Sequence, residues 1–323
     1  MLRAASRRIH PTAVLEAGCK LGEGVRVGPF CVVGRDVTLG DGVTLESHVN
    51  VSGHTTVGKG SLVHSFAALG AAPFDFKYEG EPTVLRLGAN CRIGEYAHLS
   101  GGTAAGGGLT SIGDRCLIMS HCHVAHDCAL GDGVLLASSA ALAGHVHVGD
   151  GARISGYACV HQKVSVGRGA FLGGGAVLAD DLVPFGLAVG NRAQLHGLNL
   201  RGLRRGGTPG AELRALLSAF RYLFELRETD GLYPPLPLPP LPTLRERAAA
   251  CAAAYDATRH PRLAEMVRFV LGRRQIAAPA AAGAVAPLEG EGAAHHRALC
   301  QPPRERTGTR VQSTDSLRAT ERL

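Results

Sequence analysis

Tryptophan is absent from this chain of 323 residues, and aromatic residues make up only 5% of it. The nine cysteines are an odd number and contain no C-x-x-C pair, which argues against a disulfide framework or a cysteine-based metal cage. No apolar run is long enough to span a membrane, so we expect no membrane insertion. A repeat begins at Ile9 and leaves no room for the apolar centre of a signal peptide. These absences predict a cytoplasmic protein.

Basic residues outnumber acidic ones, 34 to 27, and the formal net charge is +7. Such a balance suggests an acidic partner or substrate. We expect no nucleic-acid partner, because the chain has no recognition helix, zinc-finger spacing or interleaving of aromatic and basic residues. The 44 glycines instead favour a repetitive, turn-rich fold.

A six-residue repeat organises the first 180 residues or so. Aliphatic residues recur at every sixth position from Ile9 to Leu69, from Leu87 to Leu99 and from Ile112 to Leu178. An amphipathic helix would repeat at about 3.6 residues, so a period of six indicates a short strand, a turn and another short strand. Three such sides close a triangular coil of 18 residues, and stacked coils are expected about 4.8 Å apart.

The position four residues after each aliphatic residue is small or aliphatic nearly throughout, which predicts a second inward-facing position. Six cysteines occupy it, so we expect them to be buried side chains and neither disulfides nor metal ligands. These six are Cys19, Cys31, Cys91, Cys116, Cys122 and Cys128.

Breaks in the repeat predict the domain organisation. Residues 71–84 and 100–110 are expected to be loops extruded from a β-helical domain over residues 1–190. A small helical domain should follow over 191–275, and the composition of 276–323 predicts a disordered tail. Within the helical domain, Thr208 is the expected N-cap of a helix with Pro209 in its first turn.

The richest polar cluster lies within the repeat, in the stretch I-M-S-H-C-H-V-A-H-D-C from Ile118 to Cys128. His126 and Gly144 are 18 residues apart and should stack on neighbouring coils. Histidine takes up a proton near neutral pH, and a backbone N–H left uncovered by glycine can stabilise an oxyanion. Asp127 could hold His126 in one tautomer. His126, Asp127 and Gly144 are therefore the candidate catalytic residues.

Two other interpretations of this cluster remain open. The histidines could be solvated turn residues without a function. His121 and His126 also have an H-x4-H spacing, which some β-helical carbonic anhydrases use to bind zinc with a histidine of a neighbouring subunit. His98 is poorly phased to be a third ligand, so the preferred expectation is that the site holds no metal.

The sequence resembles the bacterial family of UDP-N-acetylglucosamine 3-O-acyltransferases over about residues 8–273. The resemblance rests on I-H-P-T-A (9–13), G-P-F-C-V-V-G (28–34), D-F-K-Y-E-G-E-P-T (75–83), G-G-G-L-T (106–110), H-V-A-H-D-C (123–128), L-A-G-H-V (142–146), H-Q (161–162), G-N (190–191) and G-L-R-R (202–205). It implies a mainly β fold, a left-handed parallel β-helix of hexapeptide repeats followed by a small C-terminal α-helical domain. It also implies a homotrimer with sites between subunits and no metal.

The implied reaction is the first step of lipid A biosynthesis. A 3-hydroxyacyl chain moves from acyl carrier protein, where it is a 4′-phosphopantetheine thioester, to the 3-hydroxyl of UDP-N-acetylglucosamine. No further cofactor is implied. The resemblance makes His126 the general base, Asp127 its orienting partner and Gly144 the oxyanion donor.

The resemblance also assigns the residues that bind the substrates. Those lining the sugar and pantetheine site are Asp75, Lys77, His123, His145, His161 and Gln162. Asn199 and Arg205 are implied to contact the uridine diphosphate, and Gly174 to measure the acyl chain. Acyl carrier protein is acidic and would suit the basic patch of Arg192, Arg201, Arg204 and Arg205.

The sequence departs from the family in the second loop, which reads Ser100-Gly101-Gly102-Thr103 where H-R-G-T is usual. This places the contacts to the acyl donor in question. Two alternatives follow: a related UDP-sugar N-acyltransferase, whose family has an extra N-terminal domain, or a non-catalytic trimeric scaffold that binds acyl carrier protein. An acceptor with a 3-amino group in place of the hydroxyl fits the same motifs.

Overall fold

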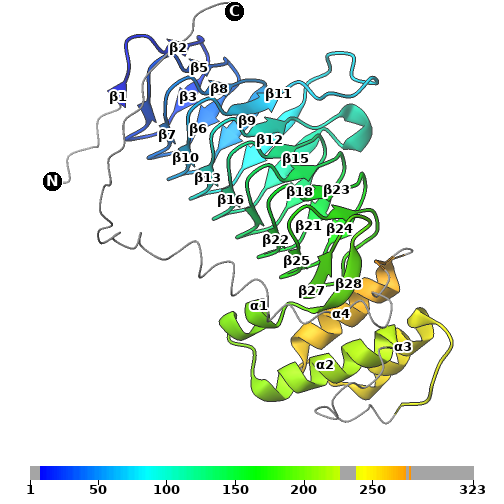
Figure 1. The fold of residues 1–323 in the computed structure, drawn as a ribbon. Coiled ribbons are helices and arrows are strands. Elements are labelled where there is room, and N and C mark those ends of the chain that lie inside the picture. Colours follow the sequence, from blue (N-terminus) through cyan, green and yellow to red (C-terminus); the bar gives the residue numbers. More distant parts are fainter. Residues whose placement is uncertain (1–7, 226–237, 274–275, 278–323) are drawn as a thin grey trace, which may run out of the picture. The chain divides into compact units, whose positions relative to one another are not determined.

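The computed structural model describes residues 8–225, 238–273 and 276–277 (Figure 1). Short strands at the repeat positions build a helix of β-coils, and every coil contributes one strand to each of three sheets. Neighbouring strands pair in parallel, as Arg8–Ile9 does with Arg26–Val27 one coil later. The sole antiparallel pair among the described strands is β27 with β28.

The strands of sheet A are β1 (Arg8–Ile9), β4 (Arg26–Val27), β7 (Thr44–Leu45), β10 (Leu62–Val63), β13 (Arg92–Ile93), β16 (Leu117–Ile118), β19 (Leu135–Leu136), β22 (Arg153–Ile154), β25 (Phe171–Leu172), β27 (Gly186–Val189) and β28 (Gln194–Leu198). Those of sheet B are β2 (Val14–Leu15), β5 (Val32–Val33), β8 (Asn50–Val51), β11 (Ala68–Ala71), β14 (His98–Ser100), β17 (His123–Val124), β20 (Ala141–Leu142), β23 (Cys159–Val160) and β26 (Val177–Leu178). Those of sheet C are β3 (Lys20–Leu21), β6 (Thr38–Leu39), β9 (His54–Val57), β12 (Val84–Leu87), β15 (Leu109–Ile112), β18 (Ala129–Leu130), β21 (His147–Val148) and β24 (Ser165–Val166).

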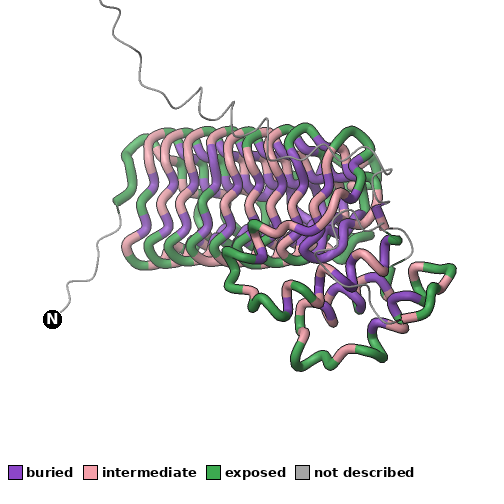
Figure 2. Tube along the Cα trace, turned by 60° about the horizontal axis from the view of Figure 1, so that its bottom comes forward, coloured by how far each residue is buried: buried purple, intermediate pink, exposed green. Residues whose placement is uncertain are grey.

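The core fills the interior of the coils. Repeat positions such as Leu39, Ile118 and Leu142 are buried, and buried residues alternate with intermediate and exposed ones along the coils in Figure 2. Five of the six repeat-position cysteines are buried and Cys19 is half-buried, and all six are free thiols. The predicted burial of these cysteines is therefore confirmed for all but Cys19, which lies in a first, open-ended coil.

The turns that join the sheets form three corners, which we name after the sheets that they connect. The AB corner leads from sheet A to sheet B, the BC corner from B to C, and the CA corner from C to A. Loop one (residues 72–83) joins β11 to β12, and loop two (101–108) joins β14 to β15 and contains the short helix η1 (Ala104–Gly106). Both loops therefore extend from the BC corner.

Four α-helices follow the coils: α1 (Leu200–Arg205), α2 (Gly210–Phe224), α3 (Leu244–Ala254) and α4 (Pro261–Gly272). An ion pair of 2.7 Å between Arg262 and the buried Glu212 joins α4 to α2. The predicted start of α2 is wrong by one residue. Pro209 is its N-cap, and both the hydroxyl and the backbone N–H of Thr208 donate to the Leu203 carbonyl in the last turn of α1.

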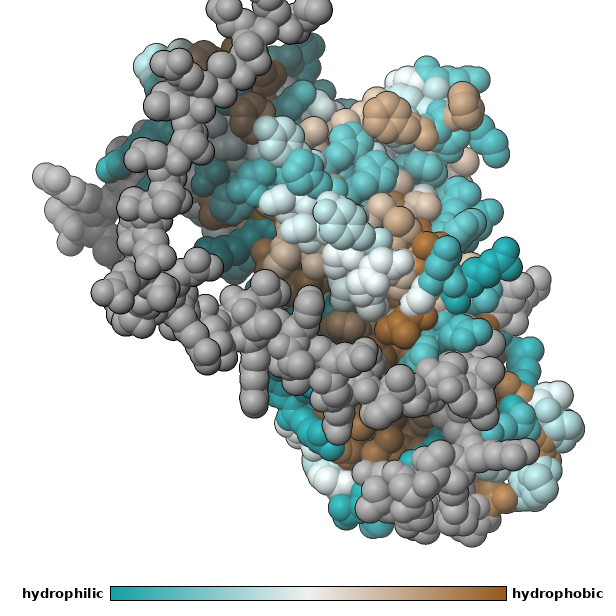
Figure 3. Space-filling model, in the orientation of Figure 1, coloured by the Kyte–Doolittle hydropathy of each residue, from teal (hydrophilic) through white to brown (hydrophobic). Residues whose placement is uncertain are grey.

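Sheet A continues past residue 190, the predicted domain boundary, because β28 pairs with β27. The first two residues of the predicted tail are attached to the coils, because Ile276 pairs with Asp181 and the N–H of Ala277 donates to the Asp181 carbonyl. Residues 278–323 lie outside the described residues. No helix in the part of the chain that the structure describes is long and apolar enough to cross a membrane. Hydrophilic and hydrophobic residues are interspersed over the face of the coils in Figure 3.

Candidate active site

His126 and Asp127 lie in the BC corner between β17 and β18, and both side chains are buried. Asp127 has a φ of +59°, a left-handed conformation that aspartate tolerates better than most residues. The tight corner turns the Asp127 carboxylate back beneath loop two, which explains how an acidic side chain comes to be buried at a corner.

Two threonines hold Asp127. The backbone N–H of Thr103 donates to Oδ1 at 2.8 Å, and the Thr103 hydroxyl donates to Oδ2 at 2.6 Å. The Asp127 N–H in turn donates to the Thr110 hydroxyl at 2.8 Å. Burial alone would raise the pKa of the Asp127 carboxyl, but the hydrogen bonds from Thr103 and His126 outweigh it and lower that pKa. The carboxyl is therefore an ionised acceptor at neutral pH.

This carboxylate determines the tautomer of His126. Nδ1 of His126 lies 2.8 Å from Asp127 Oδ2. An ionised carboxylate can only accept, so Nδ1 must carry the proton and donate it. In the neutral ring Nε2 is then left with its lone pair, ready to take a proton. Asp75, from loop one, places Oδ2 at 3.9 Å from that same Nε2.

Gly144 lies one coil above His126, as the 18-residue spacing predicts. The His126 ring rests against its backbone so closely that an added Cβ would lie 2.5 Å from Cε1 and 2.7 Å from Nε2. The Gly144 carbonyl accepts from the Lys163 N–H, whereas the Gly144 N–H donates to no group among the described residues. A free backbone donor therefore lies beside the basic nitrogen, which is the arrangement that an acyl transfer needs.

Two further predicted residues, His145 and His123, lie close to this centre. His145 packs edge-on against the His126 ring at 5.1 Å, with its Nδ1 3.7 Å from Asp127 Oδ2. His123 lies three residues before His126 on β17 and stacks on His98. Burial, followed by the nearby charges of His98 and His126, lowers the pKa of His123.

Other predicted residues are farther from His126. Lys77 is exposed in loop one, and His161 and Gln162 are exposed at the BC corner of the coil above Gly144. Gly174 is exposed at the AB corner, and its nearest neighbour for an added Cβ is the Gly156 carbonyl at 3.5 Å. The open space beside Gly174 is compatible with its predicted role in chain length, but one copy of the chain does not bring it to the BC corner.

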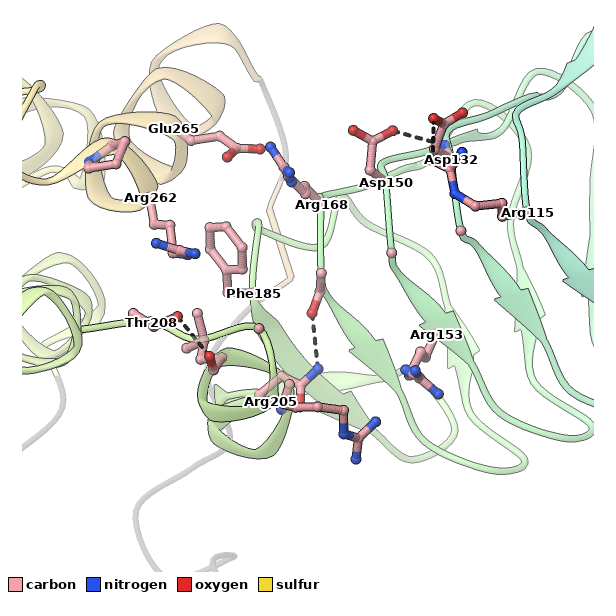
Figure 4. A pocket seen from close by; sticks show the side chains of 18 of the residues that line it. Arg115, Asp132, Asp150, Arg153, Arg168, Phe185, Arg205, Thr208, Arg262 and Glu265 are labelled. Carbon is pink, nitrogen blue, oxygen red and sulfur yellow. Dashed lines mark hydrogen bonds and ion pairs between the residues drawn. The ribbon is translucent and has the colours of Figure 1, made fainter. Parts of the chain in front are cut away.

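Asn199 and Arg205 line a separate cavity of about 930 Å³ at the CA corner (Figure 4). Asn199 caps α1, accepting from Gly202 N–H, and donates to the Gly169 carbonyl of the coils. The guanidinium of Arg205 is exposed. The cavity is rich in arginine, since Arg115, Arg153, Arg168, Arg262 and Arg268 also line it, against three carboxylates.

The two histidines of the zinc alternative, His121 and His126, lie at different corners of the coil. His121 lies at the AB corner and stacks on Tyr96 at 5.0 Å, so it does not share a site with His126 at the BC corner. Within the described residues, the side chains close enough to share a metal are His126, Asp127 and His145. Both oxygens of Asp127 already accept hydrogen bonds, which a metal would have to displace.

Sequence reasoning missed the residues that hold the centre in place. Thr103 and Thr110 come from loop two and β15, 24 and 17 residues from Asp127. Gly106 also belongs to this set, because an added Cβ there would lie 2.0 Å from the Asp127 carboxyl carbon. The motifs G-G-T and G-G-G-L-T contain all three residues, so these motifs were the available signal.

Two family models match the chain. One, described as UDP N-acetylglucosamine O-acyltransferase, domain 2, matches residues 181–277, and the other, described as bacterial transferase hexapeptide (six repeats), matches residues 109–144. An acyl-[acyl-carrier-protein]–UDP-N-acetylglucosamine O-acyltransferase of Mesorhizobium japonicum is 49% identical over 231 residues, 72% of this chain and 83% of the relative. Its namesake in Brucella ovis is 42% identical over 262 residues, 81% of this chain and 88% of the relative.

The solved structures agree with these relatives. UDP-N-acetylglucosamine acyltransferase from Campylobacter jejuni is 35% identical with a TM-score of 0.76, over 84% of this chain and 100% of that one. The hexapeptide match and this structural similarity confirm the predicted left-handed parallel β-helix with its small C-terminal helical part.

Proposed function

The chain belongs to the family of acyl-[acyl-carrier-protein]–UDP-N-acetylglucosamine O-acyltransferases, and we propose that His126 is the general base of its acyl transfer. The reaction is the first step of lipid A biosynthesis, in which a 3-hydroxyacyl chain moves from acyl carrier protein to the 3-hydroxyl of UDP-N-acetylglucosamine. The observation that carries the proposal is the hydrogen bond between His126 Nδ1 and Asp127, which turns Nε2 toward Gly144, whose N–H has no acceptor among the described residues.

The reaction proceeds in two proton transfers around one tetrahedral intermediate. His126 Nε2 takes the proton of the sugar 3-hydroxyl as its oxygen attacks the thioester carbonyl. The carbonyl oxygen becomes an oxyanion, which the Gly144 N–H stabilises. The C–S bond then breaks, and the imidazolium returns its proton to the departing thiolate, which leaves the 3-O-acyl sugar and a free pantetheine thiol.

Asp127 keeps Nδ1 as the protonated nitrogen and stabilises the imidazolium that forms. Asp75 Oδ2, at 3.9 Å from Nε2, is close enough to accept a hydrogen bond from a group at this nitrogen, and we assign it the orientation of the sugar hydroxyl. Lys77, His123, His145, His161 and Gln162 are proposed to line the sugar and pantetheine site. A general base contributes about 10²–10⁴-fold and one oxyanion donor about 10²–10³-fold to such reactions.

We propose that the active form is a homotrimer. A row of neighbouring rings follows the AB corner at centroid distances of 4.7 to 5.0 Å: Phe30, His48, Phe66, Tyr96 and His121. Phe30 is 57% exposed and Tyr96 52% exposed, and exposed aromatic rings gathered along one edge are typical of a protein interface. A neighbouring copy could then bring its Asn199 and Arg205 from the CA corner to the uridine diphosphate bound beside His126.

Several finer assignments follow from the same family membership. The exposed arginines Arg192, Arg201, Arg204 and Arg205 suit an acidic acyl carrier protein. The open space at Gly174 suits an acyl chain that ends there. We propose that the enzyme works in the cytoplasm and uses no metal, since the Asp127 carboxylate is fully engaged by protein donors. The N-acyltransferase and scaffold alternatives are not favoured by the named relatives.

One assay tests the proposal directly. Purified protein is given UDP-N-acetylglucosamine and a panel of 3-hydroxyacyl carrier proteins of different chain lengths, and wild type is compared with His126→Ala. We expect a 3-O-acyl product from wild type and a loss of at least about a hundredfold in kcat for the variant. A variant that keeps most of its activity would refute the general-base role, and inert wild-type protein on every donor would refute the reaction itself.

A further inference from the structure

Three aromatic rings from two coils and a loop form a stack beside the catalytic centre. His98 on β14 and His123 on β17 are register partners in sheet B, with ring centroids 5.1 Å apart and planes 12° apart. Phe74 of loop one also stacks on His98, at 5.6 Å, and no ring contact among the described residues joins Phe74 to His123. His98 is therefore the middle ring, in contact with a substrate-site histidine and with the loop that carries Asp75.

A hydrogen bond joins the two histidines through equivalent nitrogens. Nδ1 of His98 lies 3.2 Å from Nδ1 of His123. One neutral ring must donate and the other must accept, so the tautomer of His98 selects the tautomer of His123. Both rings are half-buried, and burial is the main cause that lowers the pKa of each and favours their neutral forms.

The stack also bears on loop one. Phe74 is 86% exposed, and its ring contacts His98. The next residue is Asp75, whose Oδ2 lies 3.9 Å from His126 Nε2. Phe76, two residues along the same loop, is fully exposed and has no ring partner among the described residues. Of these two phenylalanines, Phe74 is thus the one in ring contact with the coils.

We propose that His98 is a positioning residue of the active site. Its ring anchors loop one through Phe74 and so keeps Asp75 at the basic nitrogen of His126, while its Nδ1 holds His123 in one tautomer toward the sugar nucleotide. The second half rests on the proposed function, since it takes His123 as a substrate-binding residue. His98 itself contacts no reacting atom in this assignment.

Three substitutions separate the two contacts. His98→Phe keeps a ring under Phe74 and removes the hydrogen bond to His123. His98→Asn keeps a polar atom near the position of Nδ1 and removes most of the stacking surface. Phe74→Ala removes the anchor from the loop side, and Phe76→Ala is its matched control two residues away.

The readouts are kcat and KM for UDP-N-acetylglucosamine, and the rate at which trypsin cuts after Lys77 in the folded protein, followed by mass spectrometry. We expect His98→Phe to raise KM about three- to tenfold, with kcat and the tryptic rate within about twofold of wild type. His98→Asn and Phe74→Ala should be cut about three- to tenfold faster and lose kcat, because Asp75 is then held less often at His126. Phe76→Ala should match wild type in both readouts.

The proposal is overturned if His98→Phe keeps the wild-type KM, or if Phe74→Ala is cut no faster than Phe76→Ala. These outcomes differ from a failure of the proposed function. Wild-type protein with no acyl transfer would refute that function and, with it, the assignment of His123. The tryptic rates would still decide whether His98 anchors loop one, because they need no turnover.

Discussion

Replacing Gly144 by alanine tests the contact on which the active-site geometry depends. The added methyl group would lie 2.5 Å from His126 Cε1, 2.7 Å from Nε2 and 3.1 Å from Nδ1, whereas ordinary contacts begin at 3.4 Å. The ring must therefore withdraw by about 0.9 Å, the difference between 3.4 and 2.5 Å. Gly144 is not in a left-handed conformation, so alanine itself fits the backbone without strain.

This shift of the His126 ring should lower the catalytic rate more than the stability of the fold. The His126 ring is tied to Asp127 by a bond of 2.8 Å, which a movement of that size would stretch or break. A misplacement of about 1 Å in a catalytic group can cost about 10²-fold in rate. We therefore expect Gly144→Ala to lower kcat by about a hundredfold with little change in the thermal unfolding midpoint. Alanine keeps the backbone N–H, so the oxyanion donor is still present.

The assay is acyl transfer measured for Gly144→Ala, for His126→Ala and for the double variant. If the methyl group acts by displacing His126, then adding it to His126→Ala should cost almost nothing more. Gly210→Ala is the matched control, because its added Cβ would meet only Arg214 Nη1 at 3.6 Å. Independent, multiplying losses in the double variant, or near-normal activity of Gly144→Ala, would refute the reasoning.

Three further predictions concern the support of this centre. Thr103→Val removes the 2.6 Å hydrogen bond to Asp127 and should lower kcat about five- to tenfold, whereas an unchanged kcat would show that the backbone N–H suffices. Asp127→Asn should destabilise the fold at neutral pH. The pKa of Asp127 is lower in the folded than in the unfolded chain, so the ionised carboxylate contributes its full stabilisation above the unfolded-state pKa of about 3.9. That contribution is lost as the pH falls through the folded-state pKa. The free energies of unfolding of wild type and variant should therefore converge in acid. Arg262→Ala leaves Glu212 buried without its 2.7 Å partner and should cost about 2–3 kcal/mol of unfolding free energy by denaturant titration, a loss that Arg259→Ala at an exposed site should not reproduce.

Much of the fold follows from one periodic property of the sequence. A period of six places every sixth side chain inside a coil, and the small size of residues such as Cys91 and Cys122 lets them fill the interior at the second inward position. The same period aligns positions 18 residues apart, which is why counting along the chain is enough to match His126 with Gly144. The handedness of the coil does not follow from the spacing, and only the family resemblance predicts it.

The parts that the sequence alone did not determine are those that leave the repeat. Loops one and two do not follow the repeat, so the sequence did not predict the hydrogen bonds of Thr103 to Asp127 or the stacking of Phe74 on His98. The predicted start of α2 is wrong by one residue, because Thr208 closes the end of α1 through its hydrogen bonds to Leu203 and Pro209 takes the N-cap position.

The sequence by itself determined which residues share a coil position, since that depends only on counting along a regular strand and turn. Tertiary structure decided which corner each residue occupies and what covers it. It placed both loops over His126 at the BC corner and Asn199 and Arg205 at the CA corner, because these segments lie outside the repeat and their contacts, not counting along the chain, set their neighbours.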